Sequence, residues 1–106
     1  MIKAVFFKKD GRLSGFSLSG HAGYGTRGND VCCAAVSSAA ELVCNTVTDF
    51  FGCDAQAEAA DNCVTLNMKS GCGEGYKLIE SFYTHLGFIA EEFPHGIMIS
   101  INEIPN

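Results

Sequence analysis

Basic residues are few in this chain and are spread along its length. Seven lysines and arginines stand against twelve aspartates and glutamates, which gives a formal net charge of −5 at pH 7. Recognition of nucleic-acid phosphates needs lysines and arginines gathered in one patch. The composition therefore disfavours a nucleic-acid-binding surface, and we expect no direct nucleic-acid partner.

Long apolar runs are also missing, because no stretch approaches the ~20 residues that cross a membrane as a helix. The opening segment, MIKAVFFKKDG, holds too short an apolar stretch for a signal peptide, and its residues alternate as those of a strand do. The sequence predicts a cytoplasmic protein without a membrane partner.

Metal-ligand patterns are absent too. None of the six cysteines and three histidines falls in a C-x-x-C or H-x-x-x-H spacing, so we expect neither a metal nor another cofactor. A disulfide framework has no secretory signal to support it. We expect most of the thiols to be reduced and to pack as small hydrophobes.

The residues that are present suit one domain spanning 1–106. Hydrophobic residues make up 47% of the chain and charged residues 18%, which argues against disorder. A chain of this length has room for one hydrophobic core and not for two. No internal repeat, linker or low-complexity segment interrupts it.

The periodicity of the chain predicts five strands and two helices in the order ββαββαβ. Alternation and turn residues place strands at 2–8, 12–19, 54–60, 63–69 and 96–104. Helical spacing places helices at 31–51 and 76–93, with 70–75 as a loop. The expected fold class is α+β, with two helices packed on a mixed five-stranded sheet. The first helix is apolar nearly all round, so the second helix or a partner subunit should cover it besides the sheet.

A glycine-rich stretch at 20–37 carries the strongest chemical signal. Asn29 and Asp30 are typical N-cap residues, which puts Cys33 in the first turn of the helix. The helix dipole and the free N–H groups of that turn favour a thiolate, and the same N–H groups are candidate oxyanion donors. His21 lies twelve positions upstream, on a loop whose glycines let the backbone change shape. The pair predicts a cysteine nucleophile with a histidine base.

Each of these residues also has a plainer interpretation. A buried thiol is the common state of a cysteine in an apolar helix, and Cys32 competes with Cys33 because about 100° of helix separates them. Asp30 is first of all an N-cap, and orientation of the histidine is its alternative role. Ser37 is more typical of a packing contact, and Arg27 of a solvated loop residue.

At these residues the chain resembles the ribosomal-processing cysteine proteases, the Prp family. The family signature is Gly-His-Ala, a glycine-rich loop, and then Asp-Ile-Val-Cys-Ala-x-x-Ser. Here these segments are GHA at 20–22, a loop to Gly28, and DVCCAAVS at 30–37. The spacing from histidine to cysteine matches without a gap, and length and element order fit the whole chain. Cys33 matches the catalytic cysteine, and Cys32 stands where valine is usual.

The resemblance implies an activity and a set of residue roles. It implies a homodimer that removes the N-terminal extension of large-subunit ribosomal protein twenty-seven by cutting after a Phe-Phe pair. It makes Cys33 the nucleophile and His21 the base, with supporting roles for Gly20, Asp30 and Ser37. The loop expected to close over the peptide contains Ala22, Gly23, Tyr24, Gly25, Arg27 and Gly28.

Two other functions stay open at this point. A thiol redox sensor would use Cys32 and Cys33, and its mark would be reversible oxidation. A non-catalytic ribosome-associated binding module would use the loop and would need no thiol. The acidic charge suits a basic ribosomal partner in every case, so it does not distinguish the three.

Overall fold

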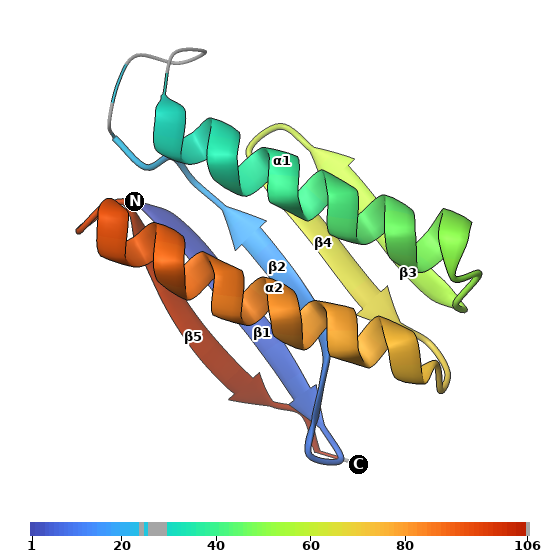
Figure 1. Ribbon diagram of the computed structural model, residues 1–106. Helices are drawn as coiled ribbons and strands as arrows, with labels where there is room; N and C mark the ends of the chain where they lie inside the picture. The colour runs from blue at the N-terminus through green and yellow to red at the C-terminus, as the bar shows by residue number, and fades with distance from the viewer. Residues whose placement is uncertain (24, 26–29, 106) are drawn as a thin grey trace.

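The computed structural model describes residues 1–23, 25 and 30–105, and it places two helices on one face of a sheet (Figure 1). The strands are β1 (Ile2–Lys9), β2 (Arg12–Ser19), β3 (Ala55–Ala60), β4 (Cys63–Met68) and β5 (Ile97–Glu103). The helices are α1 (Val31–Asn45), which continues as the π-helix η1 (Thr46–Phe50), and α2 (Gly73–Glu92). The predicted α+β class and the ββαββαβ order are confirmed.

The sheet is mixed, as predicted, with the strand order β3-β4-β2-β1-β5. The pair β1–β5 is parallel, and the other three pairs are antiparallel. Asp10 and Gly11 connect β1 to β2 and both have positive φ, 54° and 77°, as a two-residue hairpin turn requires. The central strand β2 then leads directly into the loop that carries His21, next to the start of α1 (Figure 1).

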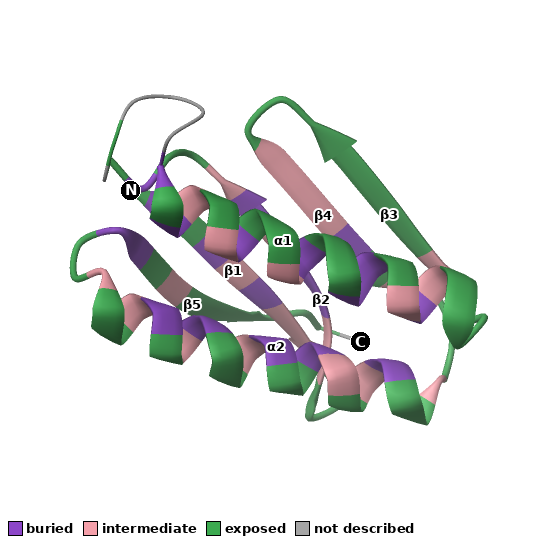
Figure 2. Cartoon of the chain, turned by 45° about the horizontal axis from the view of Figure 1, so that its top comes forward, coloured by how far each residue is buried: buried purple, intermediate pink, exposed green. Residues whose placement is uncertain are grey.

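The core lies between the sheet and the inner faces of the two helices (Figure 2). Phe6 of β1 and Phe16 of β2 are fully buried, because every second strand residue points to the helix side. Their rings lie 5.8 Å and 4.8 Å from the ring of Phe82 in α2, centroid to centroid. This aromatic cluster holds the sheet and α2 together, and α1 covers the sheet beside it.

The first helix occupies the predicted range but is not α-helical throughout. Its last five residues form η1, with wider π-type hydrogen bonding. The Thr46 hydroxyl, at the junction, donates to the Leu42 carbonyl at 2.7 Å, a contact that bends helices. Gly52, with φ 64°, follows and ends the helix as predicted.

The second helix begins at Gly73, earlier than the predicted start at residue 76. The loop predicted at 70–75 is therefore partly helical, and Cys72 is the N-cap residue. Cys72 forms a disulfide with Cys53, which follows the first helix, because the end of η1 lies beside the start of α2. These two cysteines are exceptions to the expectation that most of the thiols are reduced, which holds for four of the six. The remaining four, Cys32, Cys33, Cys44 and Cys63, are free.

The segment Val31–Phe50 is long and apolar enough to cross a membrane by length and composition. This contradicts the expectation that no such run is present. Serine, threonine and asparagine residues make the segment less uniformly apolar, but Glu41 and Asp49 are its only charged residues. One such helix is weak evidence for a membrane span, because core helices of soluble proteins pass the same test. Here its inner face is buried in the core, through Val36, Ala40 and others.

Candidate active site

Asp30 caps α1 and fixes the start of the helix. Its buried side chain accepts a hydrogen bond from the Cys33 N–H at 3.0 Å, and its carbonyl accepts one from the Ala34 N–H at 3.0 Å. Of the two roles considered for Asp30, capping is therefore present in the structure. Of the first-turn N–H groups considered as oxyanion donors, that of Cys33 is already used by the cap.

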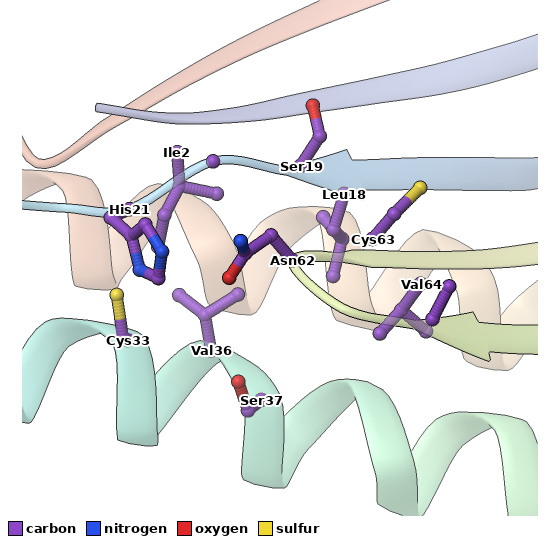
Figure 3. A pocket seen from close by; sticks show the side chains of 12 residues that line it. Ile2, Leu18, Ser19, His21, Cys33, Val36, Ser37, Asn62, Cys63 and Val64 are labelled. Atoms are coloured by element: carbon purple, nitrogen blue, oxygen red, sulfur yellow. The ribbon is translucent and has the colours of Figure 1, made fainter. Parts of the chain in front are cut away.

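The two adjacent cysteines point to different surroundings. Cys32 is fully buried in the core, whereas Cys33 is half-buried and faces a pocket (Figure 3). Burial, then the nearby charges of Asp30 and Cys33, raise the pKa of the Cys32 thiol above its usual value. Cys32 is thus protonated and hidden, and Cys33 is the thiol that a substrate can reach.

The loop before the helix is anchored on both sides of His21. Gly20 has φ 89°, and a β-carbon there would lie 2.7 Å from the Met1 carbonyl oxygen, so only glycine fits. The Gly20 N–H donates to the Asn62 carbonyl at 3.2 Å. On the other side, Ala22 is buried and its N–H donates to the Cys33 sulfur at 3.2 Å. The backbone N–H that points at the sulfur therefore comes from the loop and not from α1.

His21 and Cys33 face one another between two hollows. Figure 3 shows the exposed His21 ring, from the end of β2, and the Cys33 sulfur, from α1, pointing toward one another. Both residues line a hollow of about 210 Å³, with apolar walls from Ile2, Leu18, Val36 and Val64. Both also line a second hollow, of about 440 Å³, with Gly23, Gly25, Asp30, Ala34 and Ser37.

The structure brings most of the predicted site residues together. Ser37 lies one helical turn after Cys33 and lines both hollows, and Gly20 lines the first (Figure 3). Gly23 and Gly25 line the second hollow, and Ala22 contacts the sulfur through its N–H. The remaining predicted loop residues, Tyr24, Arg27 and Gly28, lie outside the described residues.

Residues from the β3–β4 turn complete the first hollow, and the sequence does not predict them at the site. The Asn62 side chain projects into it between His21 and Val36, and Cys63 and Val64 lie beyond (Figure 3). Asn62 has φ 61°, which suits a turn, so its sequence context indicates only a turn. The pairing of β2 with β4, which sets Ser19 opposite Cys63, brings this turn to the site.

No metal centre is formed among residues 1–23, 25 and 30–105. In that part of the chain no three side chains of histidine, cysteine, aspartate or glutamate are placed to hold a metal ion.

The chain matches the family described as cysteine protease Prp over residues 1–98. The chain belongs to this family. Prp-family members are cysteine proteases, so the protein is a hydrolase that acts on peptide bonds. Among curated proteins none matches it.

Solved structures show the same fold. Prp of Staphylococcus aureus, an essential ribosomal processing protease with a covalently linked product peptide, has a TM-score of 0.88 at 20% identity. That match covers 96% of this chain and 100% of the other. The same protease with a substrate peptide has a TM-score of 0.83 at 19% identity, with the same coverage. SMU.848 from Streptococcus mutans has a TM-score of 0.79 at 27% identity, over 98% of this chain and 96% of the other.

Proposed function

We propose that this Prp-family protease removes the N-terminal extension of large-subunit ribosomal protein twenty-seven by cutting after a Phe-Phe pair. In this proposal Cys33 is the nucleophile and His21 the general base. The observation that carries it is the position of the Cys33 sulfur. It receives the Ala22 N–H at 3.2 Å and faces the His21 ring on the wall between two hollows. The printed description of the S. aureus relatives, ribosomal processing protease, supports the class of substrate.

The two residues supply a complete acyl-transfer cycle. His21 takes the proton from the Cys33 thiol, and the thiolate attacks the carbonyl carbon of the scissile bond. His21 then gives the proton to the leaving amine, which leaves the acyl group on sulfur as a thioester. Water, deprotonated by His21, hydrolyses the thioester and restores the thiol.

The first hollow supports a large apolar side chain next to the cut. Its volume of about 210 Å³ has room for one such side chain. Its walls are mostly apolar, with contributions from Ile2, Leu18, Val36 and Val64. Because the hollow begins at Cys33, the side chain that fills it belongs to a residue adjacent to the bond that the sulfur attacks. A phenylalanine suits both the volume and the lining.

Mass spectrometry of peptide cleavage tests the proposal. The substrate carries a Phe-Phe pair followed by small residues, and the enzymes are the reduced wild type, Cys33→Ala, His21→Ala and Cys32→Ala. We expect cleavage after the second phenylalanine, lost in the Cys33 and His21 variants. Cys32→Ala, the matched control, should retain it, because that thiol is buried away from the hollows.

Each departure from this pattern has a distinct meaning. Cleavage that survives in Cys33→Ala would refute the nucleophile, and cleavage at another bond would refute the proposed specificity. A folded wild type that binds the extension from its own organism without cutting it would favour the ribosome-associated binding module. The redox-sensor alternative is disfavoured because Cys32 is buried and its raised pKa keeps it protonated.

A further inference from the structure

Five of the seven basic residues gather at the end of the molecule opposite His21 and Cys33. They come from three separate segments and line two adjoining hollows; they are Lys8, Lys9, Arg12, Lys69 and Lys77. The β1–β2 turn lies beside the connection from β4 to α2, which brings the three segments together (Figure 1). The eight residues of β2, about 26 Å of strand, separate this end from the loop of His21.

The two hollows adjoin at shared lining residues, and we call them together the basic groove, defined by these five residues. The larger, of about 410 Å³, contains Lys8, Arg12 and Lys77, and the smaller, of about 330 Å³, contains Lys9, Arg12 and Lys69. Arg12 and Tyr76 line both hollows, so they form the boundary between them. The Arg12 guanidinium lies over the Tyr76 ring, 5.0 Å from its centroid, which holds the cation in place at that boundary.

The charge of the groove is opposite to that of the rest of the protein. Two carboxylates, Asp10 and Glu80, line it beside the five cations. Within residues 1–23, 25 and 30–105, none of the five cations takes part in an ion pair. The remainder of the chain carries two basic residues and ten acidic ones. Five neighbouring cations that make no ion pair among the described residues attract a polyanion, and a bound anion would relieve their mutual repulsion.

We propose that the basic groove binds the phosphate backbone of single-stranded RNA. Two adjoining hollows that share Arg12 and Tyr76 suit successive phosphates better than one small anion. An arginine stacked on an aromatic ring presents the flat surface on which bases stack. The concave shape is unsuited to a membrane surface. The expectation of no nucleic-acid partner rested on basic residues that are spread along the sequence, and the fold gathers them.

The protease then has two oppositely charged surfaces, one for each kind of partner. The acidic remainder of the protein suits a basic ribosomal protein, and the basic groove suits the RNA to which such a protein binds. The RNA-binding proposal rests on the proposed function only for the source of the RNA, because the basic groove lies away from His21 and Cys33. RNA held at one end would then leave the site at the other end accessible to the peptide.

Fluorescence anisotropy with a labelled 20-nucleotide single-stranded RNA tests the proposal on the full chain. Binding should weaken as salt rises, with a slope of log K against log salt of about −3.5 if five phosphates are neutralised. Arg12→Gln should weaken binding about 5- to 10-fold. Lys3→Gln is the matched control, because it also removes one positive charge but lies at the other end of β1, and it should leave binding unchanged.

Three outcomes would overturn the proposal: no salt-dependent binding, equal weakening by Arg12→Gln and Lys3→Gln, or binding to phosphatidylserine vesicles but not to RNA. Displacement of the RNA by millimolar inorganic phosphate, at matched ionic strength, would reduce the groove to a single-phosphate site. Lys69→Gln serves as a second variant if Arg12→Gln lowers the melting temperature. Cleavage of the Phe-Phe peptide should be unchanged in all three variants, so loss of RNA binding and loss of the proposed protease function are distinguishable.

Discussion

Gly20 is the residue on which the placement of His21 depends most directly. It has φ 89°, and an added β-carbon would meet the Met1 carbonyl oxygen at 2.7 Å. Gly23 offers a matched comparison, because it has a similar φ of 82° but open space around the position of its β-carbon. The two glycines lie three residues apart. Alanine would cause backbone strain at both positions but a steric clash only at Gly20, so comparing them separates the two effects.

We expect Gly20→Ala to reduce both stability and turnover more than Gly23→Ala does. A left-handed alanine costs about 1–2 kcal/mol at either position, and the clash with Met1 adds to this only at Gly20. Relief of that clash moves the chain next to His21, so kcat should fall with the melting temperature. Thermal unfolding and peptide cleavage by the two variants measure this. Equal losses in both assays would show that the contact with Met1 is unimportant.

At the scale of elements, the Cys53–Cys72 disulfide ties the end of η1 to the N-cap of α2. The cysteines are 19 residues apart in sequence, and the loop between them contains β3 and β4. A cross-link that closes a loop of this length stabilises the folded state by about 3 kcal/mol, chiefly by restricting the unfolded chain. The cytoplasm, which is the location that the sequence predicts, would keep this bond reduced, so the bond adds stability only to the oxidised protein.

We therefore expect reductant to lower the free energy of unfolding by about 3 kcal/mol. Urea titration of the oxidised wild type, the reduced wild type and Cys53→Ala/Cys72→Ala measures this difference. The double variant is the control, because its midpoint should match the reduced wild type and should not respond to reductant. A wild type whose midpoint ignores reductant would contradict the expectation.

The elements also differ in how well the sequence predicts them. The strand ranges agree with the structure to within about a residue, because alternation and the Asp10–Gly11 turn are local signals. The start of α2 was missed because Gly71, Gly73 and Gly75 are typical of a loop. Gly75 packs closely against its neighbours: an added β-carbon would lie 2.7 Å from Cε at the flexible end of Met68 and 3.0 Å from Cys53 Sγ, so those side chains would have to shift. Tertiary packing outweighs helix propensity at this end.

At the scale of the whole molecule, the outer faces of the helices expose large apolar side chains. Leu42 of α1, Phe50 of η1 and Phe88 of α2 are 67%, 83% and 61% exposed. The sequence predicts that the first helix is covered by the second helix or a partner subunit as well as by the sheet. Within one chain α2 lies beside it but leaves its outer face exposed. Apolar side chains exposed on an outer surface are typical of an interface, and we therefore propose the homodimer that the family resemblance implies.

Light scattering after gel filtration tests the dimer. We expect a mass of twice 11.3 kDa for the wild type. We expect the mass of a single chain for Leu42→Ser/Phe50→Ser, because the two substitutions remove two large exposed apolar side chains. Met98→Ser is the control: Met98 is 54% exposed but follows buried Ile97 in β5, so it points to the opposite face of the sheet. A wild type with the mass of one chain would refute the homodimer.

The sequence alone determined the features that depend on neighbours along the chain. The order of strands and helices follows from local periodicity, and the first-turn position of Cys33 follows from the cap residue Asp30. Tertiary structure decided what lies across from what: Asn62 beside His21, Cys53 bonded to Cys72, and the lysines and Arg12 gathered in one basic groove. These contacts join segments far apart in sequence, and they exist only once strand pairing and helix packing have brought those segments together.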